Sequence, residues 1–324
     1  MKPLPLLAGA AGMVFVGGSV AVSGELAGTP LLTVQALRYA VASLLLTLVA
    51  RRLVARRLVA RRLVARGLVA RGLVRPRGAE WLWLGGVVVT GMFVFNLALV
   101  LGARHAEPAV LGVAVACVPV LLAVLGPMLE GHAPAARPVL AAVVVTAGAA
   151  LVQGFGRADG IGLLWAVVTL ACEAGFTLLA VPVLRRHGPL GVSVHSTWMA
   201  AVLFAVTGVV HEGPGAVLRL TTADLLAGAY LAVGVTALAF VLWYTCVQRV
   251  GAARAGLLTG VAPISAAATG MALGGPLPSL LVWLGVAVVT GGLALGLSRP
   301  EGAPSVLQRG RWWPTRKTVP SGSA

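Results

Sequence analysis

Charged residues are scarce in this sequence of 324 residues. Asp, Glu, Lys and Arg make up only 10% of the chain, against roughly 25% in an ordinary soluble domain. Hydrophobic residues reach 59%. A water-soluble fold would leave many long uncharged runs with no core to bury them, whereas a bilayer solvates such runs on all sides. The composition therefore excludes an ordinary soluble protein and indicates a helical membrane protein that crosses the bilayer several times.

Several signals of other protein classes are also absent. Cys117, Cys172 and Cys246 lie inside apolar runs, and their spacing suggests neither disulfides nor a metal site. Alternation of apolar and polar residues is missing, which argues against a transmembrane barrel. No Walker-type loop that would hold phosphates is present. We therefore expect no ATP-driven chemistry, no cofactor and no metal.

Ten apolar runs are long enough to be transmembrane helices. They cover about 4–22, 31–49, 81–101, 109–128, 139–153, 161–184, 192–210, 225–247, 255–273 and 280–297. With an even number of crossings, both termini lie on the same side. Basic residues gather on that side: Lys2, the block 51–77, Arg137, Arg185, Arg186, Arg249, Arg254 and the tail, against Arg104, Arg157 and Arg219 opposite. By the positive-inside rule, both termini are predicted to be cytoplasmic, in the cell membrane.

Two stretches of the chain resemble each other. Residues 105–151 and 249–295 align without a gap at a spacing of 144. The segments 144–148 and 288–292 are nearly alike, and each copy has a proline, Pro119 or Pro263, at the matching position. Such a repeat is typical of transporters built from internal repeats. Each half would have five spans, and an odd number requires opposite insertion. We therefore predict two inverted five-helix repeats, 1–153 and 161–297, followed by a disordered cytoplasmic tail, 298–324.

The block 51–77 contains five copies of a basic pentad, Arg-Arg-Leu-Val-Ala or a close variant. Because successive pentads precess around a helix by about 140°, they form no clean amphipathic face. One interpretation is a cytoplasmic loop that binds anionic headgroups. The other is a tolerated low-complexity expansion without a role. Nucleic-acid binding is disfavoured, because the block has no aromatic residues to stack on bases.

In their order and spacing, several short sequence motifs resemble those of the EamA family of the drug/metabolite transporter superfamily. They are 36–40 (Ala-Leu-Arg-Tyr-Ala), 107–111, 118–120, 129–131 and 147–148 in the first half, and 242–244, 250–255, 262–264 and 291–292 in the second. The resemblance covers nearly the whole chain except the basic block and the tail. It implies an all-α fold and alternating access to a central cavity. It also implies export of small metabolites or drugs without ATP hydrolysis.

Polar residues inside apolar spans are the candidate site residues. Glu173 lies near the middle of its span, where a carboxylate must face a cavity, pair with a cation or stay protonated. We predict that Glu173 couples protons or recognises a cation. A hydrogen bond that joins two helices is the alternative. Arg38 and Asn96 could line the cavity or serve packing. Trp243 and Tyr244 could form an aromatic wall for a cationic or flat substrate, or pack in the core.

Pro119 and Pro263 are predicted to bend their helices, either as gate hinges or as static kinks. The sequence thus favours a secondary transporter, an exporter by resemblance, acting on a small organic solute within the lipid bilayer, with protons as a candidate coupling ion. A non-transporting scaffold is an alternative. A lipid-modifying enzyme is less favoured, because the five histidines are scattered over different loops and helix ends. Whether the protein is a monomer or a homodimer is left open.

Overall fold

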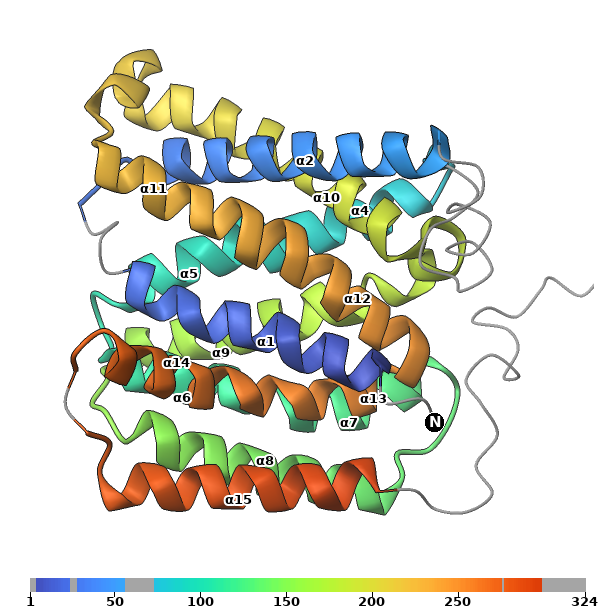
Figure 1. The fold of residues 1–324 in the computed structure, drawn as a ribbon, viewed down its shortest axis with the longest axis vertical. Coiled ribbons are helices and arrows are strands. Elements are labelled where there is room, and N and C mark those ends of the chain that lie inside the picture. Colours follow the sequence, from blue (N-terminus) through green and yellow to red (C-terminus); the bar gives the residue numbers. More distant parts are fainter. Residues whose placement is uncertain (1–3, 24–27, 56–72, 276, 299–324) are drawn as a thin grey trace, which may run out of the picture.

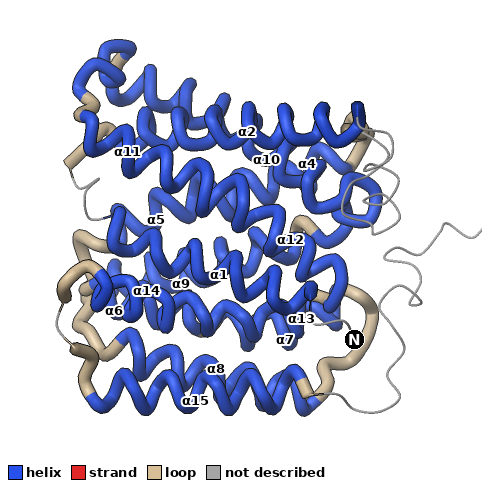
Figure 2. Tube along the Cα trace, viewed as in Figure 1, coloured by secondary structure: helices blue, strands red, loops and turns tan. Residues whose placement is uncertain are grey.

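The computed structural model describes residues 4–23, 28–55, 73–275 and 277–298 (Figure 1). Most of the basic block 51–77 and nearly all of the tail 298–324 lie outside the described residues, so a headgroup-binding loop and a disordered tail stay predictions. Within the described ranges the chain is helical, without a strand, and Ala106 and Ala158 form one isolated antiparallel bridge (Figure 2). The predicted all-α class is confirmed.

The helices follow the predicted runs closely. The first half contains α1 (Leu4–Ser23), α2 (Leu31–Ala55), α4 (Glu80–Val88), the π-helical segment η2 (Val89–Val94), α5 (Phe95–Gly102), α6 (Pro108–Ala116), α7 (Val118–Leu129) and α8 (Ala136–Gln153). The second contains α9 (Gly160–Leu178), α10 (Val181–Glu212), the 3-10 segment η3 (Pro214–Arg219), α11 (Thr222–Tyr230), the π-helical segment η4 (Leu231–Leu238), α12 (Ala239–Val250), α13 (Ala252–Leu257), the 3-10 segment η5 (Leu258–Gly260), α14 (Val261–Ala272) and α15 (Leu280–Leu297).

Nine helical stretches in the described ranges are long and apolar enough to cross a bilayer, judged by length and composition. The remaining predicted span corresponds to α1, whose apolar part Leu4–Ser19 is shorter. Large apolar side chains are exposed along the sides of the bundle, as in Leu44 at 60% and Val167 at 61%. Exposing such a large apolar surface to water is unfavourable, whereas lipid chains solvate it. The chain is therefore a polytopic helical membrane protein.

The packing pairs equivalent helices of the two predicted halves. α2 packs along α10, and α8 packs along α15. α1 lies between α12 and α14, while α9 contacts η2, α5 and α6 (Figure 1). Each first helix of a half thus inserts against the third and fourth spans of the other half. This exchange agrees with two related halves, although the inverted repeat itself stays a prediction.

α8 and α15 approach each other at glycines. A Cβ added to Gly148 would lie 2.7 Å from the amide nitrogen of Val289, and one added to Gly285 would lie 2.7 Å from the carbonyl oxygen of Gly148. Any larger residue at these positions would push the two backbones apart. Small residues at close crossings are how helices associate in membranes, where burial of apolar surface gives no driving force.

Both repeated prolines lie at the start of a helical segment. Pro119 is the second residue of α7, directly after the break at Cys117 that ends α6. Pro263 is the third residue of α14, directly after the 3-10 segment η5. Proline lacks the amide hydrogen, so a helix tolerates it only in its first turn. The prolines therefore start new helical segments where two spans are interrupted. Whether these interruptions act as gates is untested.

One predicted helix boundary differs from the structure. The predicted span 161–184 ends at Leu178, and the segment that follows belongs to α10. α10 itself is divided at Gly188, whose φ of 66° and ψ of 171° break the helix before Pro189. Hydropathy could not show this, because the run through Leu184 is continuously apolar.

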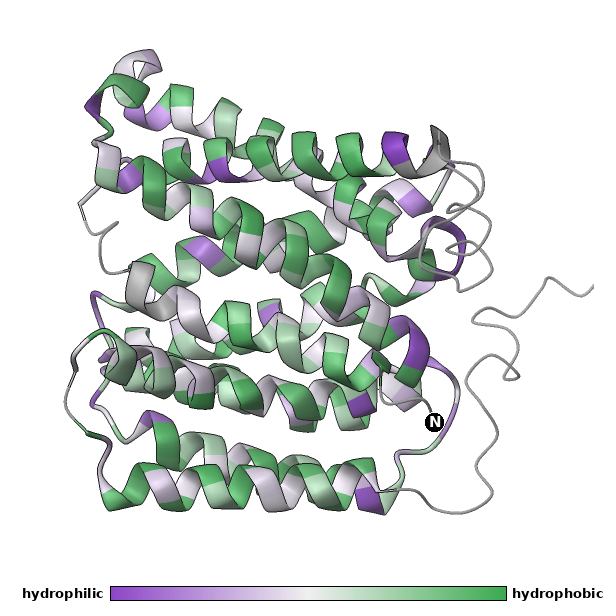
Figure 3. Ribbon diagram, in the orientation of Figure 1, coloured by the Kyte–Doolittle hydropathy of each residue, from purple (hydrophilic) through white to green (hydrophobic). Residues whose placement is uncertain are grey.

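Polar residues gather at the two ends of the bundle, with an apolar band between them (Figure 3). We call one end the Arg-rich end. It contains the start of α1, the end of α15 and the described basic residues Arg51, Arg52, Arg75, Arg77, Arg137, Arg185, Arg186, Arg249 and Arg254. The far end contains Arg104, Arg157 and Arg219. The structure thus places these two sets of basic residues at opposite ends of the bundle, and the cytoplasmic location of the Arg-rich end stays a prediction.

Candidate functional site

Arg38 is held in a polar network that joins three helical elements inside the membrane band. Its Nε donates to Thr236 Oγ1 at 2.7 Å, and its Nη1 donates to Gln35 Oε1 at 3.2 Å. Gln35 Nε2 in turn donates to Asn96 Oδ1 at 2.7 Å. The guanidinium carbon also lies 5.1 Å from the centre of the Tyr39 ring, a favourable cation–π position. The network links α2 with η4 and α5.

Two π-helical segments bring these residues to the network. η2 immediately precedes Asn96, and η4 contains Thr236. Within a π turn the backbone is wider than in an α-helix, and such turns often occur at functional sites. η2 and η4 lie at corresponding points of the third and eighth spans. Asn96 also donates from Nδ2 to the carbonyl oxygen of Met92, which occupies a backbone acceptor of the widened turn.

Glu173 lies on α9 in the membrane band. Its side chain is half-buried, and it has no hydrogen bond or ion pair with any described residue. The residues on either side of it, Cys172 and Ala174, are buried, so Glu173 lies at the border of the bundle core. A carboxylate in this position is costly without a partner. Glu173 is therefore available to bind a proton or a cation.

Trp243 and Tyr244 tie α12 to α9. Trp243 Nε1 donates to Thr177 Oγ1 at 3.0 Å, and the Tyr244 hydroxyl donates to the carbonyl oxygen of Phe176 at 3.3 Å. The rings of Phe176 and Tyr244 lie 5.1 Å apart, and those of Phe176 and Phe240 lie 4.9 Å apart. Trp243 and Tyr244 are both buried. In this conformation they pack beside Glu173 and do not present an open aromatic wall.

The structure thus brings the predicted residues together in two groups. Arg38 and Asn96 form one group, and Glu173 lies with Trp243 and Tyr244 in the other. Sequence reasoning missed Tyr39, which belongs to the first group: its hydroxyl accepts from Asn96 Nδ2 at 3.4 Å, and its ring stacks on Phe204 with the centroids 5.5 Å apart. The available signal was its position beside Arg38 in a chain with only three tyrosines.

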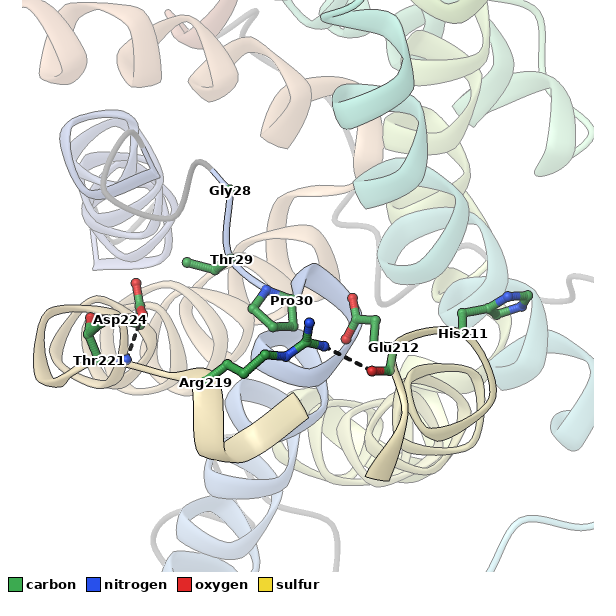
Figure 4. A pocket seen from close by; sticks show the side chains of 8 residues that line it. All are labelled: Gly28, Thr29, Pro30, His211, Glu212, Arg219, Thr221 and Asp224. Atoms are coloured by element: carbon green, nitrogen blue, oxygen red, sulfur yellow. Dashed lines mark hydrogen bonds between the residues drawn. The ribbon is translucent and has the colours of Figure 1, made fainter. Parts of the chain in front are cut away.

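A polar hollow of about 600 Å³ opens at the far end of the bundle (Figure 4). It is lined by Gly28, Thr29, Pro30, His211, Glu212, Arg219, Thr221 and Asp224. The carboxylate of Glu212 accepts from the amides of Leu32 and Thr33, both at 2.8 Å, and so caps the start of α2 from another helix. The sequence signal for this hollow was the polar loop 211–224. Its lining makes it a candidate entrance for solutes.

A narrower apolar pocket of about 160 Å³ lies between α2 and α11. Asp224 lines both this pocket and the hollow, and Arg38 lines the pocket from the side of the network. The two spaces are therefore neighbours along α2. Nowhere in the described ranges do three His, Cys, Asp or Glu residues gather as metal ligands.

Comparison with known proteins identifies relatives of the chain. Residues 160–298 match the EamA-like transporter family. The chain is 25% identical over 231 residues to the uncharacterized transporter YetK of Bacillus subtilis (strain 168), a match that covers 68% of this chain and 70% of that protein.

A solved crystal structure superposes with a TM-score of 0.70 at 19% identity, covering 91% of this chain and 96% of its own. At that identity the likeness concerns the fold alone. It does, however, extend over both halves of the bundle. The family match itself covers residues 160–298, the second half of the chain, and the chain is similar there to the EamA-like transporters.

Proposed function

We propose that the protein is a secondary transporter that moves a small organic solute across the cell membrane by alternating access, in the direction of export. The observation that carries the proposal is Glu173, a carboxylate inside the membrane band without a polar partner in the described chain. Binding a proton or a cationic solute would remove the cost of its charge. Exchange between the two would couple export to the proton gradient.

The arrangement of the bundle supports alternation between two related halves. π-helical segments occur in the third and eighth spans, interruptions occur in the fourth and ninth, and equivalent helices pair at opposite edges of the bundle, α2 with α10 and α8 with α15 (Figure 1). Irregular helices around a midplane site are the pattern of transporters with inverted repeats. In this proposal the halves rock about the core that contains Tyr39, Tyr244 and Glu173.

The test is counterflow in proteoliposomes with the purified chain. Pools of amino acids, amines and cationic drugs are screened with and without an imposed proton gradient. We expect gradient-driven accumulation of at least one pool, and its loss in Glu173→Gln. Glu107→Gln is the matched control, because Glu107 is an exposed glutamate at the far end, paired with Arg157.

Flux that persists unchanged in Glu173→Gln would contradict the coupling role while leaving transport intact. Absence of flux from every pool would contradict transport itself and would favour the scaffold alternative. Orientation is tested separately, by labelling single cysteines from each side of the membrane. Label reaching position 52 only from outside the cell would reverse the proposed topology.

A further inference from the structure

Glu80 is the centre of a clamp at the Arg-rich end. Its carboxylate accepts from Arg186 Nη1 at 2.6 and 2.7 Å, from the backbone amide of Arg77 at 2.8 Å, and lies 3.2 Å from His187 Nε2. Glu80 begins α4, whereas Arg186 and His187 belong to the first part of α10. A guanidinium, a backbone amide and an imidazole meet on one half-buried carboxylate, and the charged pair of Glu80 with Arg186 makes this a strong local contact. The clamp therefore fastens the start of α10 to α4.

The clamp is adjacent to a break in the helix. Gly188 directly follows His187, and its φ of 66° is accessible to glycine with little cost. Pro189 then begins the long part of α10. α10 thus consists of a short helix of residues 181–187 and a long helix of residues 189–212, joined at one residue. Such a joint lets the short helix change direction without disturbing the long one.

Buried polar atoms without partners concentrate around the same joint. In the described ranges, three side-chain atoms are buried and form no hydrogen bond: His187 Nδ1, Ser193 Oγ and Gln248 Oε1. His187 and Ser193 flank Gly188, and Gln248 Nε2 donates to the carbonyl oxygen of Leu184 at 2.7 Å. Because buried polar groups are normally paired, unpaired ones need an explanation. No hydrogen bond of these three atoms to the described chain holds this packing around the joint in place.

The long part of α10 makes its own contacts at this end. The His195 ring lies 5.3 Å from the His187 ring, edge to face, and His195 Nε2 donates to the carbonyl oxygen of Val74 at 2.9 Å. The segment before α4 is therefore tied to the long helix by Val74 and to the short helix through Arg77 and Glu80. Opening the clamp would remove the polar contacts of the short helix with α4, so that the Gln248–Leu184 hydrogen bond and the packing of Val183 and Leu184 would hold it alone, while the long helix keeps its contact.

We propose that the Glu80 clamp is the gate of the Arg-rich end, and that the short helix 181–187 swings about Gly188 when the clamp opens. The proposal rests on the transport function proposed above, since a gate needs two states. In the open state, water reaches the three unpaired atoms. The closed state is the one described by this structure.

The experiment measures water access at the joint. Ser193→Cys is introduced into a chain whose native Cys117, Cys172 and Cys246 are replaced by alanine. A membrane-impermeant maleimide is then applied from the side of the Arg-rich end. We expect Glu80→Gln and Arg186→Gln each to raise the labelling rate about tenfold, as for the loss of a charged hydrogen bond. Arg186→Lys, which keeps the charge, should label nearly as slowly as the parent.

Two further variants separate the gate from general loosening. Glu107→Gln, which breaks the exposed pair at the far end, should leave the labelling rate unchanged. Gly188→Ala, which disfavours the backbone conformation of the closed joint, should itself raise the labelling rate above that of the parent, and adding Glu107→Gln should not raise it further. Unchanged labelling in Glu80→Gln and Arg186→Gln would overturn the proposal, as would an equal rise in Glu107→Gln.

Failure of the gate and failure of transport can be told apart. The labelling assay needs neither a substrate nor flux. Faster labelling in Glu80→Gln with no counterflow from any pool would support the clamp and contradict transport. Counterflow without any change in labelling would support transport and contradict the clamp. Size-exclusion profiles and melting temperatures of each variant verify that the compared chains are folded.

Discussion

Arg38 and Glu173 both place a charge well inside a membrane-spanning helix, yet the protein surrounds them differently. Arg38 has two hydrogen-bond acceptors from two elements and an aromatic ring beside it. Glu173 has no polar partner in the described chain. Hydrogen bonds to neutral groups hold a charged side chain in place, whereas a charge without a partner is costly until something binds to it. On this contrast, we expect Arg38 to serve packing and Glu173 to serve binding.

The largest effect is expected at Glu173. Replacing it with Gln removes the charge and keeps the shape, so gradient-driven accumulation should fall to the level of protein-free liposomes. The melting temperature in detergent should stay the same or rise, because an unpaired buried charge is removed. A clear fall in melting temperature would show that Glu173 is paired after all and would erase the contrast with Arg38.

At Arg38 we expect the main effect on stability, not on transport. Arg38→Met leaves Thr236 and Gln35 without their donor, so we expect a loss of about 2–3 kcal/mol in unfolding free energy. Arg38→Lys retains one donor and should lose less. Chemical unfolding in mixed micelles measures the difference. An Arg38→Met chain as stable as the parent would mean that the network contributes nothing to folding.

Asn96 belongs to the same hydrogen-bond network as Arg38 and is connected to it through Gln35. Asn96→Leu removes the acceptor of Gln35 Nε2 and the donor to the carbonyl oxygen of Met92. A loss of about 1–2 kcal/mol is expected. Combined with Arg38→Met, the loss should be smaller than the sum of the two, because both changes break one connected network. Strict additivity would contradict that connection.

The smallest effect on stability is expected at the exposed pair of Asp159 with His105, which serves as a reference for the buried residues. Asp159 accepts from the Gly162 amide and pairs with His105 at 3.0 Å, and these contacts hold the pKa of Asp159 below its ordinary value. A lowered pKa in the folded state gives stability that is present above the ordinary pKa and is lost as the pH falls through the folded one. Asp159→Asn should therefore matter slightly at neutral pH and not at all in strong acid, as thermal melts across pH would show.

Much of the fold could be predicted because its signals are local. Long apolar runs predict helices, and the recurrence of Pro119 at Pro263 marks equivalent interruptions. The end of α9 at Leu178 is not visible in the hydropathy, since the residues on both sides are apolar; its sequence signal is Pro182, which lies in the first turn of α10. The π-helical segments η2 and η4 have no sequence signal, because they depend on how neighbouring helices pack.

The site could be predicted as residue types but not as contacts. An acid in the middle of an apolar span indicates Glu173 directly. Which residues would satisfy Arg38 depends on α2 meeting η4 and α5, and Thr236 lies 198 positions away in the sequence. The same reason explains why Glu80 could not be paired with Arg186 in advance. The sequence does not distinguish a substrate-binding role of Trp243 and Tyr244 from packing in the core. Their hydrogen bonds to α9 show that they are packed in this conformation.

The glycine crossing of α8 and α15 has a mechanical consequence. At Gly148 and Gly285 the two backbones touch, so no side chains stand between them that could slip past one another. One of these helices comes from each half of the chain. Sliding along this seam would collide with the flanking side chains, whereas a small rotation about it costs little. During the proposed rocking of the two halves, this seam would therefore hold α8 and α15 together as one pair.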